Sequence, residues 1–137
     1  MLLERITITP ASTNSTEISD AEAGALARTT VNLFRQWNIS DAQASTLLGG
    51  LSARTWARWK EGNLGRIDRD LKMRMAHLMG IHKGLRHLFK EPARGYAWVK
   101  APNSAFGGAS ALDFMLRGEL SDLAAIREWL DAERGAW

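Results

Sequence analysis

The sequence of 137 residues predicts an all-α protein. From Asp20 onward, apolar residues recur at three- and four-residue spacing almost throughout, which is the pattern of amphipathic helices. Serine, aspartate and glycine stand at the ends of these segments, where helices take their N-caps and C-terminal breakers. Ile6 and Ile8 alternate with threonines and allow one short strand. We find no internal repeat and no heptad array.

The first helix is expected to begin with Asp20 as its N-cap and to end at Asn38. Glu22 falls in the first turn, where a carboxylate favours the helix dipole. The preceding residues are rich in serine and threonine, so we expect residues 1–19 to form a flexible tail. The helical spacing runs through Leu26, Thr30, Leu33 and Trp37.

Two short helices follow, separated by glycines. Ser40 and Gln43 have the spacing of a capping box, and the helix that they begin is expected to end at Gly49 and Gly50. Ser52 is the expected N-cap of the next helix, which ends at a further glycine, Gly62.

A long fourth helix is expected to begin at Asp68. Gly80 and Gly84 lie inside it, and each weakens a helix by about 1 kcal/mol relative to alanine. Because they are four residues apart, they also suit the close approach of a neighbouring backbone. The core-facing stripe of this helix consists of Leu71, Met75, Leu78, His82, Leu85 and Phe89.

The segment Lys90–Ala109 is expected to be a loop, because it contains two prolines, several glycines and no helical periodicity. So long a loop in a compact domain is usually functional or disordered. Its aromatic residues Tyr96, Trp98 and Phe106 argue against disorder. We therefore expect an ordered surface that docks a partner.

Two helices complete the chain. Ser110 is the expected N-cap of a short helix that Gly118 closes. Ser121 is the expected N-cap of the final helix, which Gly135 closes. Leu123, Ile126 and Leu130 form the buried stripe of this last helix.

Composition narrows the class of protein. The absence of cysteine excludes a disulfide framework and a thiolate zinc site. There is no 18-residue apolar run and no signal-peptide pattern, so we expect a cytoplasmic protein without membrane contact. Residues 54–109 carry twelve basic and four acidic side chains between two acidic ends. Such a band suits nucleic acid or an acidic protein, or is simply a solvated basic face.

Residues 40–62 have the pattern of a helix-turn-helix. Ala44 is small where two helices would cross, and Gly49 suits a left-handed turn. In the second helix Trp56 is expected in the core with Trp59 beside it. In this motif the second helix enters the major groove of DNA, which makes Ser52, Arg54, Thr55, Arg58 and Lys60 the candidate DNA contacts. The alternative is a packed helix pair with no DNA contact.

Four further runs extend this pattern. Residues 55–62 read T-x-x-R-W-x-E-G, residues 98–108 read W-x-x-x-P-N-x-x-F-G-G, residues 112–120 read L-x-x-M-L-x-G-E-L, and residues 126–137 read IREWLDAERG-x-W. From about Asp20 to Trp137 the chain resembles the Xre/MbcA/ParS family of bacterial antitoxins. One departure is the turn GGLS at residues 49–52, which is one residue longer than the common form.

The resemblance implies a type II antitoxin. Residues 20–67 would be the Xre-like helix-turn-helix domain, and residues 68–137 a small helical domain that binds a toxin. The implied toxin is an NAD-consuming enzyme of the RES type, whose active site the antitoxin covers, and the implied DNA target is the operator of its own operon. We expect a homodimer or a larger hetero-oligomer with the toxin, because a helix-turn-helix usually reads paired half-sites.

The residues of the C-terminal half suit such an interface. Arginine and tryptophan often dominate binding energy, and a guanidinium pairs well with a carboxylate or with NAD phosphates. Trp137, at the end of the sequence, suits a nucleotide pocket. The candidate toxin-binding residues are Trp98, Asn103, Phe106, Arg127, Trp129, Leu130, Arg134, Gly135 and Trp137. Alternatively, Trp98 and Phe106 fold the loop onto the core, and Arg127 pairs with Asp131.

We do not expect an enzyme, a metal site or a cofactor. His77, His82 and His87 are five residues apart, which spreads them around a helix, and no phosphate-binding glycine motif or cysteine nucleophile is present. The remaining alternative is a stand-alone transcriptional regulator whose C-terminal domain dimerises or senses a ligand. A toxin gene beside the antitoxin gene would distinguish the two.

Overall fold

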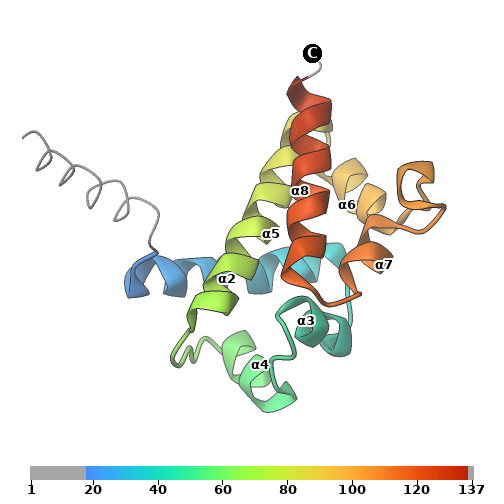
Figure 1. The fold of residues 1–137 in the computed structure, drawn as a ribbon. Helices are drawn as coiled ribbons and strands as arrows, with labels where there is room; N and C mark the ends of the chain where they lie inside the picture. Colours follow the sequence, from blue (N-terminus) through green and yellow to red (C-terminus); the bar gives the residue numbers. More distant parts are fainter. Residues whose placement is uncertain (1–17, 136–137) are drawn as a thin grey trace, which may run out of the picture.

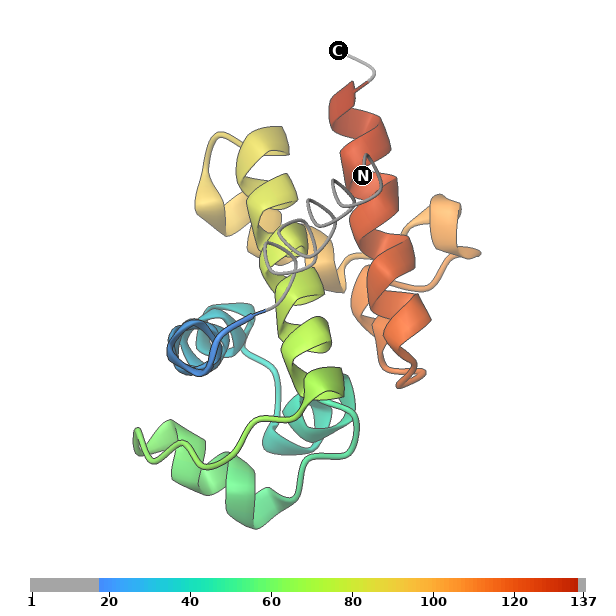
Figure 2. The same cartoon turned by 60° about the vertical axis from the view of Figure 1, so that its left-hand side comes forward.

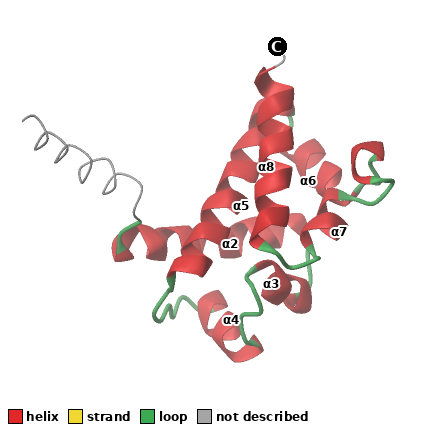
Figure 3. Ribbon diagram, viewed as in Figure 1, coloured by secondary structure: helices red, strands yellow, loops and turns green. Residues whose placement is uncertain are grey.

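The computed structural model describes residues 18–135, and these residues form seven α-helices and one 3-10 turn without a strand (Figures 1 and 3). The all-α prediction is therefore confirmed. The expected tail and the pair Ile6 and Ile8 fall in residues that the structure does not describe, apart from Ile18 and Ser19 at the end of the tail. Trp137 also lies outside the described residues.

The elements are α2 (Asp20–Trp37), α3 (Asp41–Leu47), α4 (Ala53–Lys60), α5 (Arg69–Leu88), α6 (Pro92–Lys100), the 3-10 turn η2 (Ser104–Phe106), α7 (Ala111–Met115) and α8 (Leu120–Gly135).

Most of the predicted helix caps are confirmed. Ser40 and Ser110 form capping boxes, and the side chains of Ser52 and Asp68 accept backbone N–H groups at the starts of α4 and α5. Asn38 ends α2 in the left-handed conformation, with φ of 53°. Local sequence chemistry thus determines where most of these helices begin and end.

Two expected caps are wrong by one or two positions. The N-cap of α2 is Ser19, whose hydroxyl accepts the N–H of Glu22 while the Glu22 carboxylate accepts the N–H of Ser19. At the last helix, α8 begins at Leu120, so Ser121 is already inside it. The Asp122 carboxylate accepts the Glu119 N–H at 3.2 Å and so caps a free backbone donor at the start of α8.

The segment that we expected to be a loop contains helix α6, which corrects the prediction. Pro92 is the first residue of this helix, a position where its fixed φ suits the helix and its missing N–H is not needed. Gly95 and Val99 are buried, and a Cβ at Gly95 would lie 3.3 Å from the Leu85 Cβ. Packing against α5 therefore selects a helix where the sequence shows no periodicity.

Helix α5 is the central element of the fold. It packs most extensively against α8 and also contacts α2 and α6 (Figures 1 and 2). Met75, Leu78 and Ile81 are completely buried within one hydrophobic cluster that includes residues of every α-helix. The predicted stripe is thus largely confirmed, although His82 and Phe89 are only half-buried. The buried Nδ1 atom of His82 has no hydrogen-bond partner among residues 18–135, and burial lowers the pKa of this imidazole.

The two glycines of α5 form the seat for α8. A Cβ at Gly84 would lie 3.1 Å from the Leu130 Cβ, and one at Gly80 would lie 2.2 Å from the Arg127 Nε. The close approach expected here is therefore present, but side chains of α8 rather than its backbone fill the space. The intrinsic cost of glycine in a helix is offset because a Cβ at Gly84 would press on the Leu130 side chain and one at Gly80 would displace the end of the Arg127 side chain.

A buried arginine joins the two halves of the chain. Arg74 on α5 donates from Nε to the Asp70 carboxylate at 2.8 Å. Its Nη1 donates to the Gly118 carbonyl at 2.9 Å and more weakly to the Leu47 carbonyl at 3.4 Å. The turn after α3 and the turn before α8 are thereby held on the same side chain. Buried charge of this kind is tolerated because it is paired and hydrogen-bonded.

The first prediction concerns the seat of α8. Replacing Leu130 with alanine should lower the free energy of unfolding by about 2–5 kcal/mol, because its fully buried side chain packs on Gly84. Urea denaturation followed by circular dichroism measures the loss. Met73→Ala is the control, since Met73 is the exposed large apolar residue of α5 and its loss should cost less than about 0.5 kcal/mol. Equal effects of the two substitutions would contradict this packing.

Candidate functional site

The turn between α3 and α4 depends on two glycines. Gly49 and Gly50 have φ of 80° and 91°, values that side chains with a Cβ rarely adopt. At Gly49 a Cβ would also lie 2.8 Å from the Arg74 Nε. The longer turn is thus accommodated by consecutive left-handed residues, and Leu51 then leads the chain into α4.

Helix α4 is fixed by its two tryptophans, as expected. Trp56 and Trp59 are buried, with ring centroids 6.3 Å apart, and the Trp56 ring lies 5.8 Å from that of Phe34 on α2. Aromatic side chains bury large areas and prefer such tilted contacts. Because both tryptophans face inward, the opposite side of α4 faces solvent.

Two of the candidate DNA contacts are exposed cations on that outer side. Arg54 lies in the first turn of α4 and Arg58 one turn later, and both are exposed. Ser52 is also exposed, but its hydroxyl already caps the helix and donates to the Thr55 Oγ1 at 2.9 Å. Thr55 is half-buried. The structure therefore places Ser52, Arg54 and Thr55 at the start of α4 and Arg58 in its last turn.

Lys60 differs from these residues because it has a carboxylate partner. Its ammonium lies 3.0 Å from both carboxylate oxygens of Asp41, at the start of α3. The same carboxylate accepts the Trp56 Nε1–H at 3.0 Å. Hydrogen bonds from Lys60 and Trp56 hold the pKa of Asp41 below its ordinary value. Asp41 was not among the expected site residues, because no local pattern links positions 19 residues apart.

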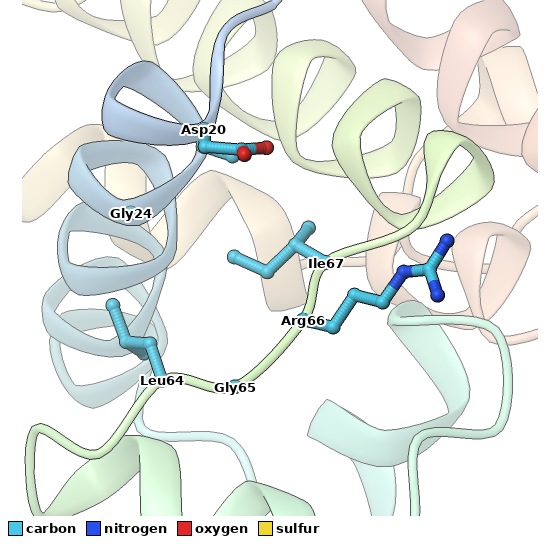
Figure 4. A pocket seen from close by; sticks show the side chains of 7 residues that line it. Asp20, Gly24, Leu64, Gly65, Arg66 and Ile67 are labelled. Atoms are coloured by element: carbon cyan, nitrogen blue, oxygen red, sulfur yellow. The ribbon is translucent and has the colours of Figure 1, made fainter.

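A hollow of about 420 Å³ lies between the start of α2 and the loop that precedes α5 (Figure 4). Leu64, Gly65 and Ile67 line it from the loop, and Gly24 lines it from α2. The exposed Arg66 extends from the same loop. Arg66 is thus a further exposed cation, in the loop that follows α4.

The candidate toxin-binding aromatics gather on one surface. The rings of Trp98 and Trp129 stack with centroids 5.6 Å apart, and Phe106 contacts both rings edge-on at 6.1 and 5.6 Å. All three side chains are half-buried. Phe114 extends the cluster, and the Arg117 guanidinium lies 4.5 Å above its ring. These residues thus fold the segment onto α8, as our alternative expected, and they also present an aromatic surface.

Asn103 has a local structural role. Its side-chain oxygen accepts the Ala105 N–H at 2.9 Å at the start of η2. The exposed Gly107 follows with φ of 70°. Such turn chemistry positions Phe106, and Asn103 itself is half-buried.

The candidate residues of α8 fall on different faces. Leu130 is completely buried, so its side chain belongs to the core, and its assignment to a partner-binding surface is a correction. Arg134 and Gly135 are exposed. Asp131 pairs with Arg134 at 3.8 Å, and the pair with Arg127 that we considered does not form. Arg127 instead lies across α5.

Among residues 18–135, no group of three or more potential metal ligands comes together. The structure also contains no helix in this range that is long and apolar enough to cross a membrane. His77 and His82 are separate half-buried side chains of α5, and burial lowers the pKa of both. The described part of the chain thus presents two groups of candidate residues, the exposed arginines of α4 and the aromatic cluster of α6, η2 and α8.

An α3–turn–α4 unit with a basic outer face, followed by a helical domain with an aromatic surface, defines a helix-turn-helix protein with a second binding module. The model of the antitoxin Xre-like helix-turn-helix domain matches residues 17–80. The model of the antitoxin Xre/MbcA/ParS C-terminal toxin-binding domain matches residues 84–135. The chain belongs to the Xre/MbcA/ParS antitoxins. The two matches meet within α5.

A relative in another bacterium shows the same extent of similarity. Uncharacterized protein y4oB of Sinorhizobium fredii (strain NBRC 101917 / NGR234) is 39% identical over 100 residues, which cover 73% of this chain and 77% of that protein. The matched length is greater than that of the helix-turn-helix domain, so the similarity is not confined to that domain.

The second prediction concerns the contact between α3 and α4. Lowering the pH should release the Trp56 indole and Lys60 from Asp41, with a midpoint below 3.8, because the pKa of Asp41 is lowered. A carboxyl with a lowered pKa contributes stability above its ordinary pKa, and the contribution is lost as the pH falls through the lowered value. The Trp56 Nε1–H resonance in 15N NMR spectra reports the midpoint.

A matched variant tests the cause of this shift. Lys60→Met should move the midpoint up towards the ordinary value of an aspartate, since the Lys60 hydrogen bonds are the largest cause of the lowered pKa. Arg54→Met is the control, because Arg54 is not a cause of that shift. An unchanged midpoint in Lys60→Met would show that Lys60 does not hold Asp41.

Proposed function

We propose that this antitoxin neutralises an NAD-consuming toxin of the RES type by covering its active site with the C-terminal domain, and that it represses its own operon through the helix-turn-helix. The observation that carries this proposal is the surface of Trp98, Phe106 and Trp129 beside the exposed last turn of α8. Family membership supports a toxin as the partner of this domain.

The aromatic surface has the composition of a binding interface. Tryptophan and arginine are the residue types that most often dominate interface energies, and Trp98, Trp129, Arg117 and Arg134 all lie on α6, α8 or the turn before α8. Since Trp98 and Trp129 are already stacked, little side-chain freedom remains to be lost on binding. We therefore propose that one toxin contact lies on this side of the domain.

The basic face of α4 supports DNA as the second partner. Arg54 and Arg58 point away from the buried Trp56 and Trp59, and they have the exposure that contacts to phosphates or base edges require. Cations on one face attract the DNA backbone in a salt-dependent way. Dimerisation on a two-fold operator would fit this arrangement.

The third prediction concerns the end of the chain. Deleting residues 133–137 should leave the fold intact, because Glu133, Arg134 and Gly135 are exposed, but should abolish toxin neutralisation. The test is co-expression with the product of the adjacent gene, with growth and cellular NAD followed for the full-length and shortened antitoxins. Circular dichroism of the shortened chain is the control for folding. Full protection by the shortened chain would refute a site at this end.

The same experiment decides between the two functional classes. Rescue by the full-length chain establishes neutralisation, and preservation of NAD establishes the NAD-consuming class of the toxin. A harmless neighbour, or one that does not associate with this protein, would instead favour a stand-alone transcriptional regulator.

The fourth prediction concerns DNA. Arg54→Ala/Arg58→Ala should weaken operator binding and reduce the slope of log K against log salt by about 1–2, because up to two phosphate contacts are lost. Gel retardation with the promoter of the operon, at several salt concentrations, measures both effects. Arg35→Ala on α2 is a matched control, since Arg35 is exposed and lies outside α4. Unchanged retardation by the double variant would remove α4 from the DNA interface.

A further inference from the structure

We propose that Arg127 is the docking point for a carboxylate of the toxin, held in place by a notch that Gly80 leaves in α5; this inference rests on the toxin binding proposed above. Arg127 lies on α8 where that helix crosses α5, and its side chain is half-buried. It is therefore separate from the aromatic surface, which Trp129 forms with Trp98 on α6.

The notch exists only because residue 80 is a glycine. A Cβ there would lie 2.2 Å from Nε, 2.5 Å from Cζ and 2.6 Å from Cδ of Arg127. The guanidinium group thus lies directly on the backbone of α5, and any larger residue would displace it. A glycine in the interior of a helix destabilises that helix. At position 80 this cost is offset by the space that glycine leaves for the Arg127 side chain.

The guanidinium has only weak and uncharged partners in the described part of the chain. Its Nη1 is 3.4 Å from the Ala76 carbonyl and 3.5 Å from the His77 Nδ1, both at the limit for a hydrogen bond. Among residues 18–135, Arg74, Arg117 and Arg134 each have a carboxylate within 4.0 Å, but Arg127 has none. Burial and the neighbouring guanidinium both lower the pKa of His77, which favours its neutral form.

A carboxylate is the group that this site lacks. A half-buried cation has lost part of its hydration. A carboxylate replaces the lost water with two parallel charge-assisted hydrogen bonds to the guanidinium. The toxin carboxylate would approach Arg127 from solvent, on the side away from α5. The fit is to one planar anion, because only one guanidinium occupies the notch.

The surroundings favour a protein carboxylate over nucleic acid or the phosphates of NAD. Glu128, Asp131 and Glu133 are exposed on the same helix, and residues 110–137 are net acidic. A polyanion such as nucleic acid would extend over these acids and be repelled by their negative charge. A single aspartate or glutamate of the toxin can contact Arg127 without approaching these acids. Basic residues of the toxin next to that carboxylate would then face the acids of α8.

The experiment measures the affinity of the full-length antitoxin for the product of the adjacent gene by isothermal titration. Arg127→Met should raise Kd by about tenfold or more, and Arg127→Lys should raise it less, because the charge remains without the bidentate geometry. Arg28→Met is the matched control, as Arg28 is exposed on α2. Its Kd should stay within about twofold of the wild-type value.

Gly80→Ala separates docking from stability. Alanine favours the helix, so the Tm should not fall, yet Kd should rise because Cβ expels Arg127 from its seat. The Gly80→Ala/Arg127→Met double variant should bind no more weakly than Arg127→Met alone, since both changes act on one contact. A Gly80→Ala protein that binds with wild-type affinity would overturn the notch as the seat.

The partner group is then identified on the toxin. Each exposed acid of the toxin is changed to its amide, and one of these changes should be non-additive with Arg127→Met in a double-mutant cycle. Absence of such coupling, or an unchanged Kd for Arg127→Met, overturns the inference but leaves the toxin-binding proposal standing. A wild-type antitoxin that does not bind the toxin overturns both.

Discussion

The packing of α5 between α2 and α8 is the constraint on which the rest of the structure depends. Met75, Leu78 and Ile81 are completely buried in it, and at about 25 cal/mol per Å² of apolar surface such residues supply a large part of the folding free energy. The aromatic surface rests on this helix through α6 and α8, whereas α4 packs on α2 and α3. At the first turns of α5, Arg74 holds the turns next to α3 and α8. Farther along, Gly80 and Gly84 seat α8, and through α8 they position Trp129 in the aromatic surface.

This arrangement explains why one small chain carries two binding modules. The family matches change from one domain to the other between residues 80 and 84, yet α5 is continuous from Arg69 to Leu88. A shared helix gives each module a core that it is too small to build alone, since small domains bury a low fraction of their surface. The helix-turn-helix and the C-terminal domain therefore share one hydrophobic core.

The two surfaces use charge in opposite ways. On α4, arginines extend from a helix whose inner side is occupied by tryptophans, and Asp41 takes Lys60 away from that outer set. On α8, the half-buried Arg127 shares a helix with the exposed acids Glu128, Asp131 and Glu133. The first arrangement suits a polyanion with many equivalent phosphates, whereas the acids of the second repel one. The distribution of charge thus distinguishes the two surfaces more than the small net charge of the chain does.

The sequence alone determined the helical class, four of the six expected N-caps, the buried tryptophans of α4 and the family. These features depend on local chemistry, such as the hydroxyl of Ser40 or Ser52 at a helix start, and on spacing within one helix. Only the tertiary structure decided that Pro92–Lys100 is a helix, because packing on α5 and not periodicity selects it. The sequence likewise did not predict the long-range partners of Asp41, Arg74 and Arg127. Lys60, the Gly118 carbonyl and the Ala76 carbonyl are each at least 19 residues away from them in sequence. Contacts of that range arise from the crossing of helices; the spacing of Gly80 and Gly84 indicates that a neighbour approaches α5, but it does not encode which helix approaches or which side chains meet.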